Sequence, residues 1–134
     1  MKISDNTIGI LRNFSDINAN ILFKPGKTLS TMSTMKNIMA QADVEEEFES
    51  EFGVYDLPEF LRAIDSFQQP VLKFNGTANL KIQDEKSTLS ARYAFADKST
   101  LRYPSKQISM PDKTVTFSLK NSDYESVKKL YTNL

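Results

Sequence analysis

The side chains in this sequence that could do chemistry are mainly carboxylates. Glutamates alternate along one stretch, at Glu45, Glu47, Glu49 and Glu51. Carboxylates spaced by two along a strand line one face of it, so they do not converge on a single ion as the ligands of a loop do. We therefore interpret them as the solvent-facing side of a strand rather than as a metal site. No metal and no other cofactor is expected.

Most catalytic arrangements are excluded by the residue types that are missing. The 134 residues include no histidine, no cysteine and only four glycines. Ser/His/Asp and Cys/His sets, disulfides and zinc–thiolate sites are therefore impossible, and no glycine-rich phosphate loop is present. A hydrolase that relies on paired carboxylates is the remaining enzymatic alternative, but no residue set indicates its substrate. The sequence predicts that the chain is not an enzyme.

Composition indicates a packed domain without a strong overall electric field. Hydrophobic residues make up 40% of the chain, and 17 Lys and Arg balance 17 Asp and Glu. A basic surface could therefore arise only by segregation of charge. We find no signal peptide and no apolar run of membrane-spanning length, which favours a cytoplasmic protein.

A strand that runs directly into a helix is predicted for residues 52–67. Residues 52–55 suit a strand, Asp56 is a good N-cap, and Pro58 is favourable in a first helical turn. Apolar residues then recur at steps of three and four and form one helical face, at Leu57, Phe60, Leu61, Ile64 and Phe67.

The other elements complete an α+β pattern. A short strand is expected at residues 1–3, followed by a helix that Ser4 or Asp5 caps. Strands are expected at residues 21–23, 28–34, 38–44, 45–51, 71–74, 78–82 and 87–94, and Asn75-Gly76 is a strong hairpin turn. Many antiparallel strands and two helices predict a sheet with both helices packed on one face.

The strand–helix design recurs near the end of the chain. A strand at residues 115–119 is expected to lead into a helix capped by Asn121 or Ser122. When the two ends are aligned, strand end, cap, apolar face and one basic position coincide, pairing Ile3 with Leu119, Asp5 with Asn121, Ile8 with Tyr124, Leu11 with Val127, Arg12 with Lys128 and Phe14 with Leu130. A unit this short could also recur by chance.

The repeat, taken as real, predicts three parts. Residues 1–95 are expected to form a complete domain, residues 96–113 a connector, and residues 114–134 the first strand and helix of a second, similar domain. Leu134 ends the chain within the apolar pattern. We therefore expect the chain to be the N-terminal part of a longer protein.

A set of short sequences occurs in a characteristic order and spacing along the chain: Met1-Lys2-Ile3-Ser4, Leu11, Asn13-Phe14, Ile17-Asn18, Tyr55-Asp56-Leu57, Phe60-Leu61, Asn79-Leu80-Lys81-Ile82 and Ser87-Thr88. In these residues, and along its whole length, the chain resembles the N-terminal part of the DNA polymerase sliding clamps of T-even-like bacteriophages. The resemblance depends on order and spacing, because clamps have no catalytic signature.

The resemblance implies a DNA-clamp domain and a function without catalysis. Such clamps are homotrimeric rings with two similar domains per subunit, in which helices line a hole that encircles duplex DNA. The ring tethers the replicative DNA polymerase for processive synthesis, a clamp-loader complex opens it, and in these phages it is tied to late transcription. This implies DNA replication in the cytoplasm of an infected bacterial host cell.

A hole of this kind suits basic residues that attract phosphates without reading bases. Candidates on helix faces turned away from the core are Arg12, Arg62, Lys128 and Lys129. Ordinary solvated helix positions are the alternative that composition alone favours, and Asp16 and Glu59 are expected beside the arginines. The alternating glutamates would repel phosphates from an outer face, or simply keep a strand soluble.

Partner docking is not located by the sequence. The aromatic and prolyl residues Tyr93, Phe95, Tyr103 and Pro104 are candidates, although burial in a core would explain them as well. The alternative function is a small α+β module that binds a partner other than DNA, in which the repeat is accidental. A second domain copy in the downstream reading frame would separate the two hypotheses.

Overall fold

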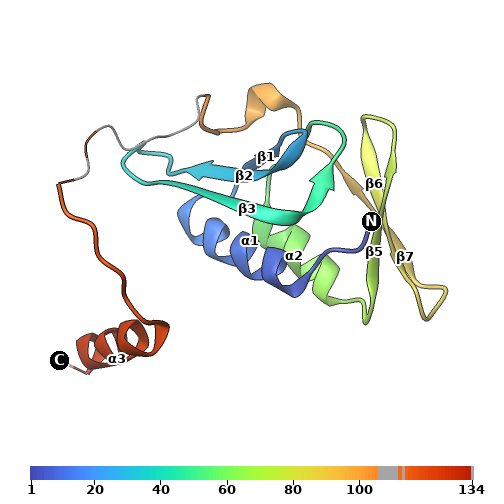
Figure 1. Cartoon of the computed structure of the whole chain (residues 1–134). Coiled ribbons are helices and arrows are strands. Elements are labelled where there is room, and N and C mark those ends of the chain that lie inside the picture. Colours follow the sequence, from blue (N-terminus) through green and yellow to red (C-terminus); the bar gives the residue numbers. More distant parts are fainter. Residues whose placement is uncertain (106–111, 113, 134) are drawn as a thin grey trace.

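The computed structural model describes residues 1–105, 112 and 114–133. Two helices and seven strands precede a short 3-10 turn, and a third helix follows near the end of the described chain (Figure 1). The elements are α1 (Asp5–Ile17), β1 (Ile21–Phe23), β2 (Gly26–Met32), β3 (Met39–Phe48), β4 (Phe52–Val54), α2 (Leu57–Asp65), β5 (Pro70–Asn75), β6 (Asn79–Asp84), β7 (Ser90–Ala94), the 3-10 turn Lys98–Thr100 and α3 (Asn121–Thr132).

The first two helices each begin at a short polar residue whose side chain caps the helix, Ser4 for α1 and Asp56 for α2. The Ser4 hydroxyl accepts a hydrogen bond from the Thr7 backbone N–H at 3.2 Å, and Asp56 accepts one from the Glu59 N–H at 3.0 Å. Each cap satisfies an N–H group that has no partner within the helix. The predicted caps of both helices are thus confirmed, with Ser4 rather than Asp5 on α1.

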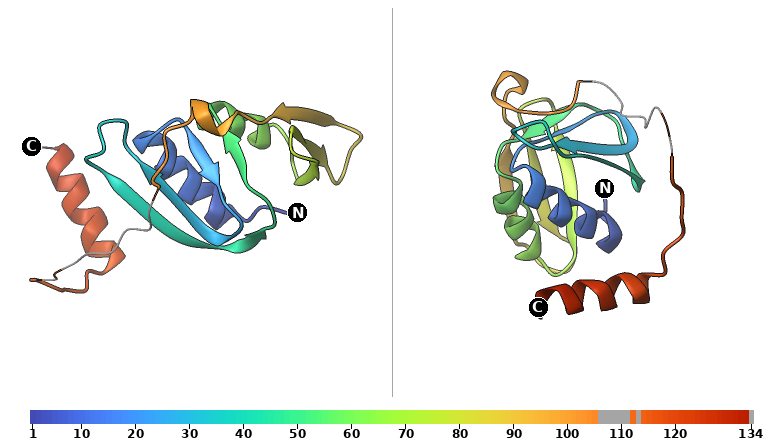
Figure 2. Two further views of the ribbon diagram at one scale, coloured as in Figure 1. Left: turned by 90° about the horizontal axis from the view of Figure 1, so that it is seen from above. Right: turned by 90° about the vertical axis from the view of Figure 1, so that its left-hand side faces the viewer.

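The strands form three small antiparallel sheets, β1–β4, β2–β3 and β5–β6–β7. Helices α1 and α2 lie side by side along one side of the β1–β4 and β2–β3 sheets (Figures 1 and 2). Their apolar faces enter one core with the inward residues of all three sheets. The predicted α+β class, antiparallel with two helices packed together, is confirmed.

Aromatic rings join the sheets inside this core. Phe52 on β4 stacks on Phe23 of β1 with ring centroids 4.4 Å apart. The same ring lies 5.9 Å from Phe48, 5.1 Å from Phe74 on β5 and 4.9 Å from Phe95, which follows β7. Phe52 therefore contacts side chains from the three sheets at once.

The chain that leaves β7 returns to β4 because Gly53 has no side chain. Ala96 donates a backbone hydrogen bond to the Gly53 carbonyl at 2.9 Å, and Leu101 is buried over the same glycine. A Cβ atom at Gly53 would lie 2.3 Å from Leu101 Cδ1 and 2.9 Å from the Ala96 carbonyl oxygen. Glycine at this position thus permits the start of the connector to dock.

Three predicted strands were wrong, one in its existence and two in their extent. Residues 1–3 form no strand, because Lys2 makes a single bridge to Val71 and Ser4 already caps α1. The predicted strand at residues 45–51 is broken, because β3 ends at Phe48 and β4 begins at Phe52. The break is where the chain leaves its pairing with β2 for pairing with β1. The strand predicted at residues 87–94 begins only at Ser90.

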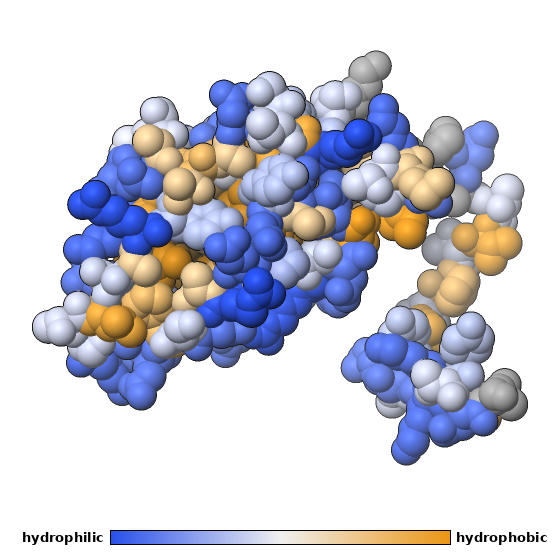
Figure 3. Space-filling model, turned by 180° about the vertical axis from the view of Figure 1, so that it is seen from behind, coloured by the Kyte–Doolittle hydropathy of each residue, from blue (hydrophilic) through white to orange (hydrophobic). Residues whose placement is uncertain are grey.

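The C-terminal segment contains the predicted helix, α3, but residues 115–119 do not form the predicted strand before it. Residues 115–119 are not paired, since no strand of the described chain lies beside them to complete a ladder. Val115 and Phe117 are exposed, and hydrophobic residues lie open along this segment in Figure 3. The predicted cap of α3 was wrong, because Lys120 occupies the cap position without a side-chain bond. Part of the predicted connector, residues 106–111 and 113, lies outside the described residues.

Candidate nucleic-acid interface

The outer surface of α1 and α2 is where the sequence places its first two phosphate-binding candidates. Both helices bury one apolar face, so every residue on the other face is directed to solvent. Arg12 on α1 and Arg62 on α2 are both exposed there. The structure thus brings these two candidates onto neighbouring helices, as a shared interface requires.

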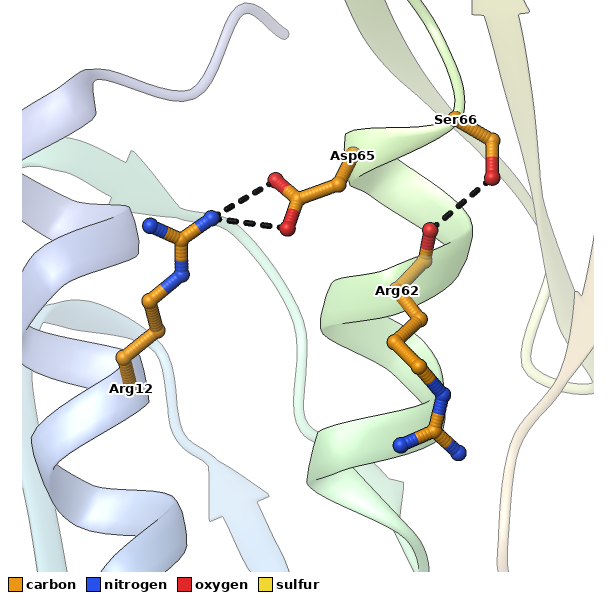
Figure 4. Close-up of polar contacts among 4 residues, drawn as sticks. All are labelled: Arg12, Arg62, Asp65 and Ser66. Carbon is orange, nitrogen blue, oxygen red and sulfur yellow. Dashed lines mark hydrogen bonds and ion pairs between the residues drawn. The ribbon is translucent and has the colours of Figure 1, made fainter.

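Arg12 is not free on this surface. Its Nη2 atom lies 2.8 Å and 2.7 Å from the two carboxylate oxygens of Asp65 on α2 (Figure 4). The Arg12 side chain is 57% exposed and the Asp65 side chain is 50% exposed. Water therefore screens the ion pair, and the pair adds little stability. Its main effect is electrostatic, because Asp65 cancels most of the field that Arg12 would offer to a phosphate.

Arg62 has a different environment. Its side chain extends along the lower part of α2, away from Asp65 (Figure 4). Within the described chain it makes no ion pair, while its backbone carbonyl accepts a hydrogen bond from the Ser66 hydroxyl at 3.0 Å. Of the two arginines, Arg62 is therefore the one whose charge is available to a ligand.

Taken together, the exposed surface of α1 and α2 is acidic rather than basic. Besides the two arginines it exposes four carboxylates, at Asp5, Asp16, Glu59 and Asp65. Two positive and four negative side chains give a net charge of −2 for these exposed positions. Such a surface cannot hold nucleic acid tightly by charge alone. It is compatible only with weak, local contacts to phosphates.

Lys128 and Lys129 lie on α3 and are both exposed. They are adjacent in sequence, so they point about 100° apart around the helix. Among the described residues no hydrogen bond or ion pair connects them with Arg12 or Arg62. The structure does not bring the four candidates together into one site.

A buried carboxylate that sequence reasoning missed lies on β3. Glu45, Glu47, Glu49 and Glu51 are exposed as predicted, whereas Glu46 is only 8% exposed. Its Oε1 atom accepts from the Ser4 backbone N–H and its Oε2 atom from the Thr7 hydroxyl, both at 2.5 Å. Glu46 therefore fixes β3 against the first turn of α1, where the helix dipole favours a negative charge.

These contacts determine the ionisation of Glu46. Burial raises the pKa of the carboxyl group, but the hydrogen bonds from Thr7 and Ser4 together outweigh it and hold the pKa below its ordinary value. The alternation of β3 contained the signal, because Glu46 shares its parity with Val44 and Phe48, which are buried. A glutamate on that side requires a partner.

A groove of about 590 Å³ runs between the β2–β3 hairpin and the segment after the 3-10 turn. Apolar residues from both sides line it, among them Met32, Met39 and Leu101, and Lys98 and Arg102 lie at the same groove. Two of the sequence candidates for partner docking, Tyr103 and Pro104, also line it. The other two, Tyr93 and Phe95, pack on the rings of Phe60 and Phe52 instead.

Comparison with curated proteins finds relatives over the whole chain, while no family model matches. The chain is 32% identical over 135 residues to the sliding clamp of Escherichia phage RB69 and 34% identical over 137 residues to that of Vibrio phage KVP40. Identity to the sliding clamp of Enterobacteria phage T4 is 27% over 135 residues. Each match covers 100% of the chain and 58–61% of the relative. The resemblance expected from the sequence is thereby confirmed.

Proposed function

We propose that this chain is the N-terminal part of a sliding clamp subunit, which encircles duplex DNA as a ring and tethers a DNA polymerase. The observation that carries the proposal is the match of the entire chain to three phage sliding clamps. The α+β fold with two helices side by side is consistent with it. The chain spans about 60% of the length of those relatives, so the ring requires the rest of a subunit.

The proposed division of the chain follows the repeat. Residues 1–95 form the first domain, residues 96–113 the connector, and residues 114–134 the start of a second domain. The apolar side chains of α3 support this, because Tyr124, Val127, Leu130 and Tyr131 are 51–79% exposed. An apolar helix face of this size is expected to be covered in the complete subunit.

The proposed contact with DNA uses the outer surfaces of the helices. Arg12 and Arg62 on the first domain, and Lys128 and Lys129 on the second, would meet phosphates without reading bases. Because the α1–α2 surface carries a net negative charge, its attraction to DNA phosphates is expected to be weak. A ring does not need tight binding, because closure around the duplex keeps it on DNA, and weak contacts allow it to slide.

The partners we propose are a DNA polymerase, a clamp-loader complex and two further copies of the subunit, in the cytoplasm of an infected bacterial cell. The clamp itself performs no catalysis in this proposal. The chain contains no histidine and no cysteine. No helix of the described residues has the length and hydropathy to cross a membrane.

The test of the ring uses the chain extended by the residues of its own downstream reading frame. The extended protein is loaded onto nicked circular duplex DNA and onto the same DNA after linearisation, and its retention is followed over time. Retention on the circle with loss from the linear form is the expected result. Equal behaviour on both would contradict a topological ring and favour the alternative, a small α+β module with a partner other than DNA.

Replacing Asp65 with asparagine is expected to strengthen the weak electrostatic contact with DNA. The change releases Arg12 from its ion pair and removes one negative charge from the α1–α2 surface. We expect about a two-fold gain in affinity for a fluorescent duplex at low salt, measured by anisotropy, because a screened surface charge contributes little more.

The matched control is Asp5→Asn, which removes the same charge from the same surface but has no ion pair with Arg12 in the described structure. A gain that appears only for Asp65→Asn, and that disappears when Arg12 is also changed to glutamine, assigns the contact to Arg12. Equal gains for both variants would show a general charge effect and would contradict the role of Arg12.

A further inference from the structure

A row of three basic residues crosses the sheet of β5, β6 and β7 on the face turned away from the core. The register pairs Lys73 on β5 directly with Lys81 on β6, and Lys81 with Arg92 on β7. Paired residues of neighbouring strands share a face, and strands are about 4.8 Å apart. The three cationic side chains therefore stand side by side in one line, which we call the basic row.

The basic row is unfavourable for the fold. Like charges that face each other directly across strands destabilise a sheet. Lys73 and Arg92 are exposed, but Lys81 between them is partly buried, so water screens it less well. In the described structure the ion pairs of basic side chains involve Lys2, Arg12 and Lys98, and no carboxylate reaches the basic row. No ion pair within the described chain compensates these charges.

The surroundings of the basic row are mainly polar and not aromatic. On the same face the neighbouring rows are Val71, Gln83 and Ser90 on one side and Asn75, Asn79 and Ala94 on the other, so four of these six residues are polar. No Asp or Glu occupies these positions. The aromatic residues of the sheet, Phe74 and Tyr93, pair with the buried Leu80 on the opposite face. The face thus offers three cations with amide and hydroxyl groups around them.

We propose that the basic row binds an acidic peptide segment of a partner protein. An extended peptide carries carboxylates on one side at every second residue, and the Arg92 guanidinium can hold a carboxylate through two hydrogen bonds. The amides of Asn75, Asn79 and Gln83 can bond to the peptide backbone. Single-stranded nucleic acid is the less suitable ligand, because its binding sites use aromatic stacking, which this face lacks. This inference is independent of the proposed clamp function.

The binding test uses a fluorescent peptide with alternating glutamate and serine residues, and follows its anisotropy on titration with the whole chain. The variant combines Lys73→Gln, Lys81→Gln and Arg92→Gln. The control combines Lys27→Gln, Lys36→Gln and Lys120→Gln, which removes the same charge at exposed positions away from the sheet face. We expect the row variant to lose about ten-fold in affinity and the control less than about three-fold.

Three results would overturn the proposal: no binding of the peptide, equal losses in both variants, or tighter binding of a single-stranded oligonucleotide of the same charge at the basic row. Lys81→Met supplies a second readout, because methionine keeps the apolar stem and removes the charge. We expect its melting temperature to rise while its affinity for the peptide falls. A fall in melting temperature would show that Lys81 serves the fold, and would also contradict the proposal.

Discussion

Replacing Phe52 with alanine is expected to lower the free energy of unfolding by about 3–5 kcal/mol, the usual cost of deleting a large buried aromatic side chain. Phe52 is 5% exposed, and its ring lies within 6 Å, centroid to centroid, of four other phenylalanine rings. These rings come from different sheets. The cavity would therefore open where the sheets meet, where backbone movement can close it only in part.

Urea unfolding followed by circular dichroism measures this loss. Phe52→Leu retains most of the apolar volume and is expected to lose less stability than the alanine variant. Tyr55→Ala, three residues away, is the surface control, because Tyr55 is 60% exposed. Its effect is expected to stay within about 0.5 kcal/mol. Similar losses for Phe52→Ala and Tyr55→Ala would show that the aromatic cluster does not hold the sheets together.

Elements whose evidence lies within a few consecutive residues could be predicted from the sequence. The cap at Asp56, the apolar face of residues 57–67 and the hairpin indicated by Asn75-Gly76 each depend on local chemistry. The structure has all three, although the hairpin turn lies at residues 76–78, because Asn75 already pairs with Asn79. The strands at residues 1–3 and 115–119 could not be judged in this way, because a strand exists only when a neighbour accepts its backbone hydrogen bonds.

The candidate interface could be predicted only in part for the same reason. Helical periodicity placed Arg12 and Arg62 on outer faces, and both are exposed. The pairing of Arg12 with Asp65 depends on how α1 lies against α2, which no local pattern specifies. The basic row likewise depends on the register of three strands. Lys73, Lys81 and Arg92 follow no local pattern in the sequence, and only the register of β5, β6 and β7 places them in one row.

Replacing Glu46 with alanine is expected to cost about 1–3 kcal/mol of unfolding free energy at neutral pH, because it removes the acceptor of one buried and one partly buried donor. The Ser4 N–H and the Thr7 hydroxyl both donate to this carboxylate, and Thr7 is fully buried. The first turn of α1 would lose its attachment to β3. Glu47→Ala, the next residue and exposed, is the control, and its effect is expected to be small.

The contribution of Glu46 is also expected to depend on pH in a defined direction. Its pKa in the folded protein is below its ordinary value, because the hydrogen bonds from Thr7 and Ser4 outweigh the effect of burial. The ionised form thus stabilises the fold fully above the unfolded-state pKa of about 4.3, and this stabilisation is lost as the pH falls through the lower folded pKa.

Glu46→Gln keeps the shape of the side chain and cannot ionise. Urea unfolding of both proteins between neutral and acidic pH should therefore show a stability difference that is constant near pH 7 and shrinks below about pH 4. A difference that stays constant throughout would mean that the charge on Glu46 does not hold β3 to α1.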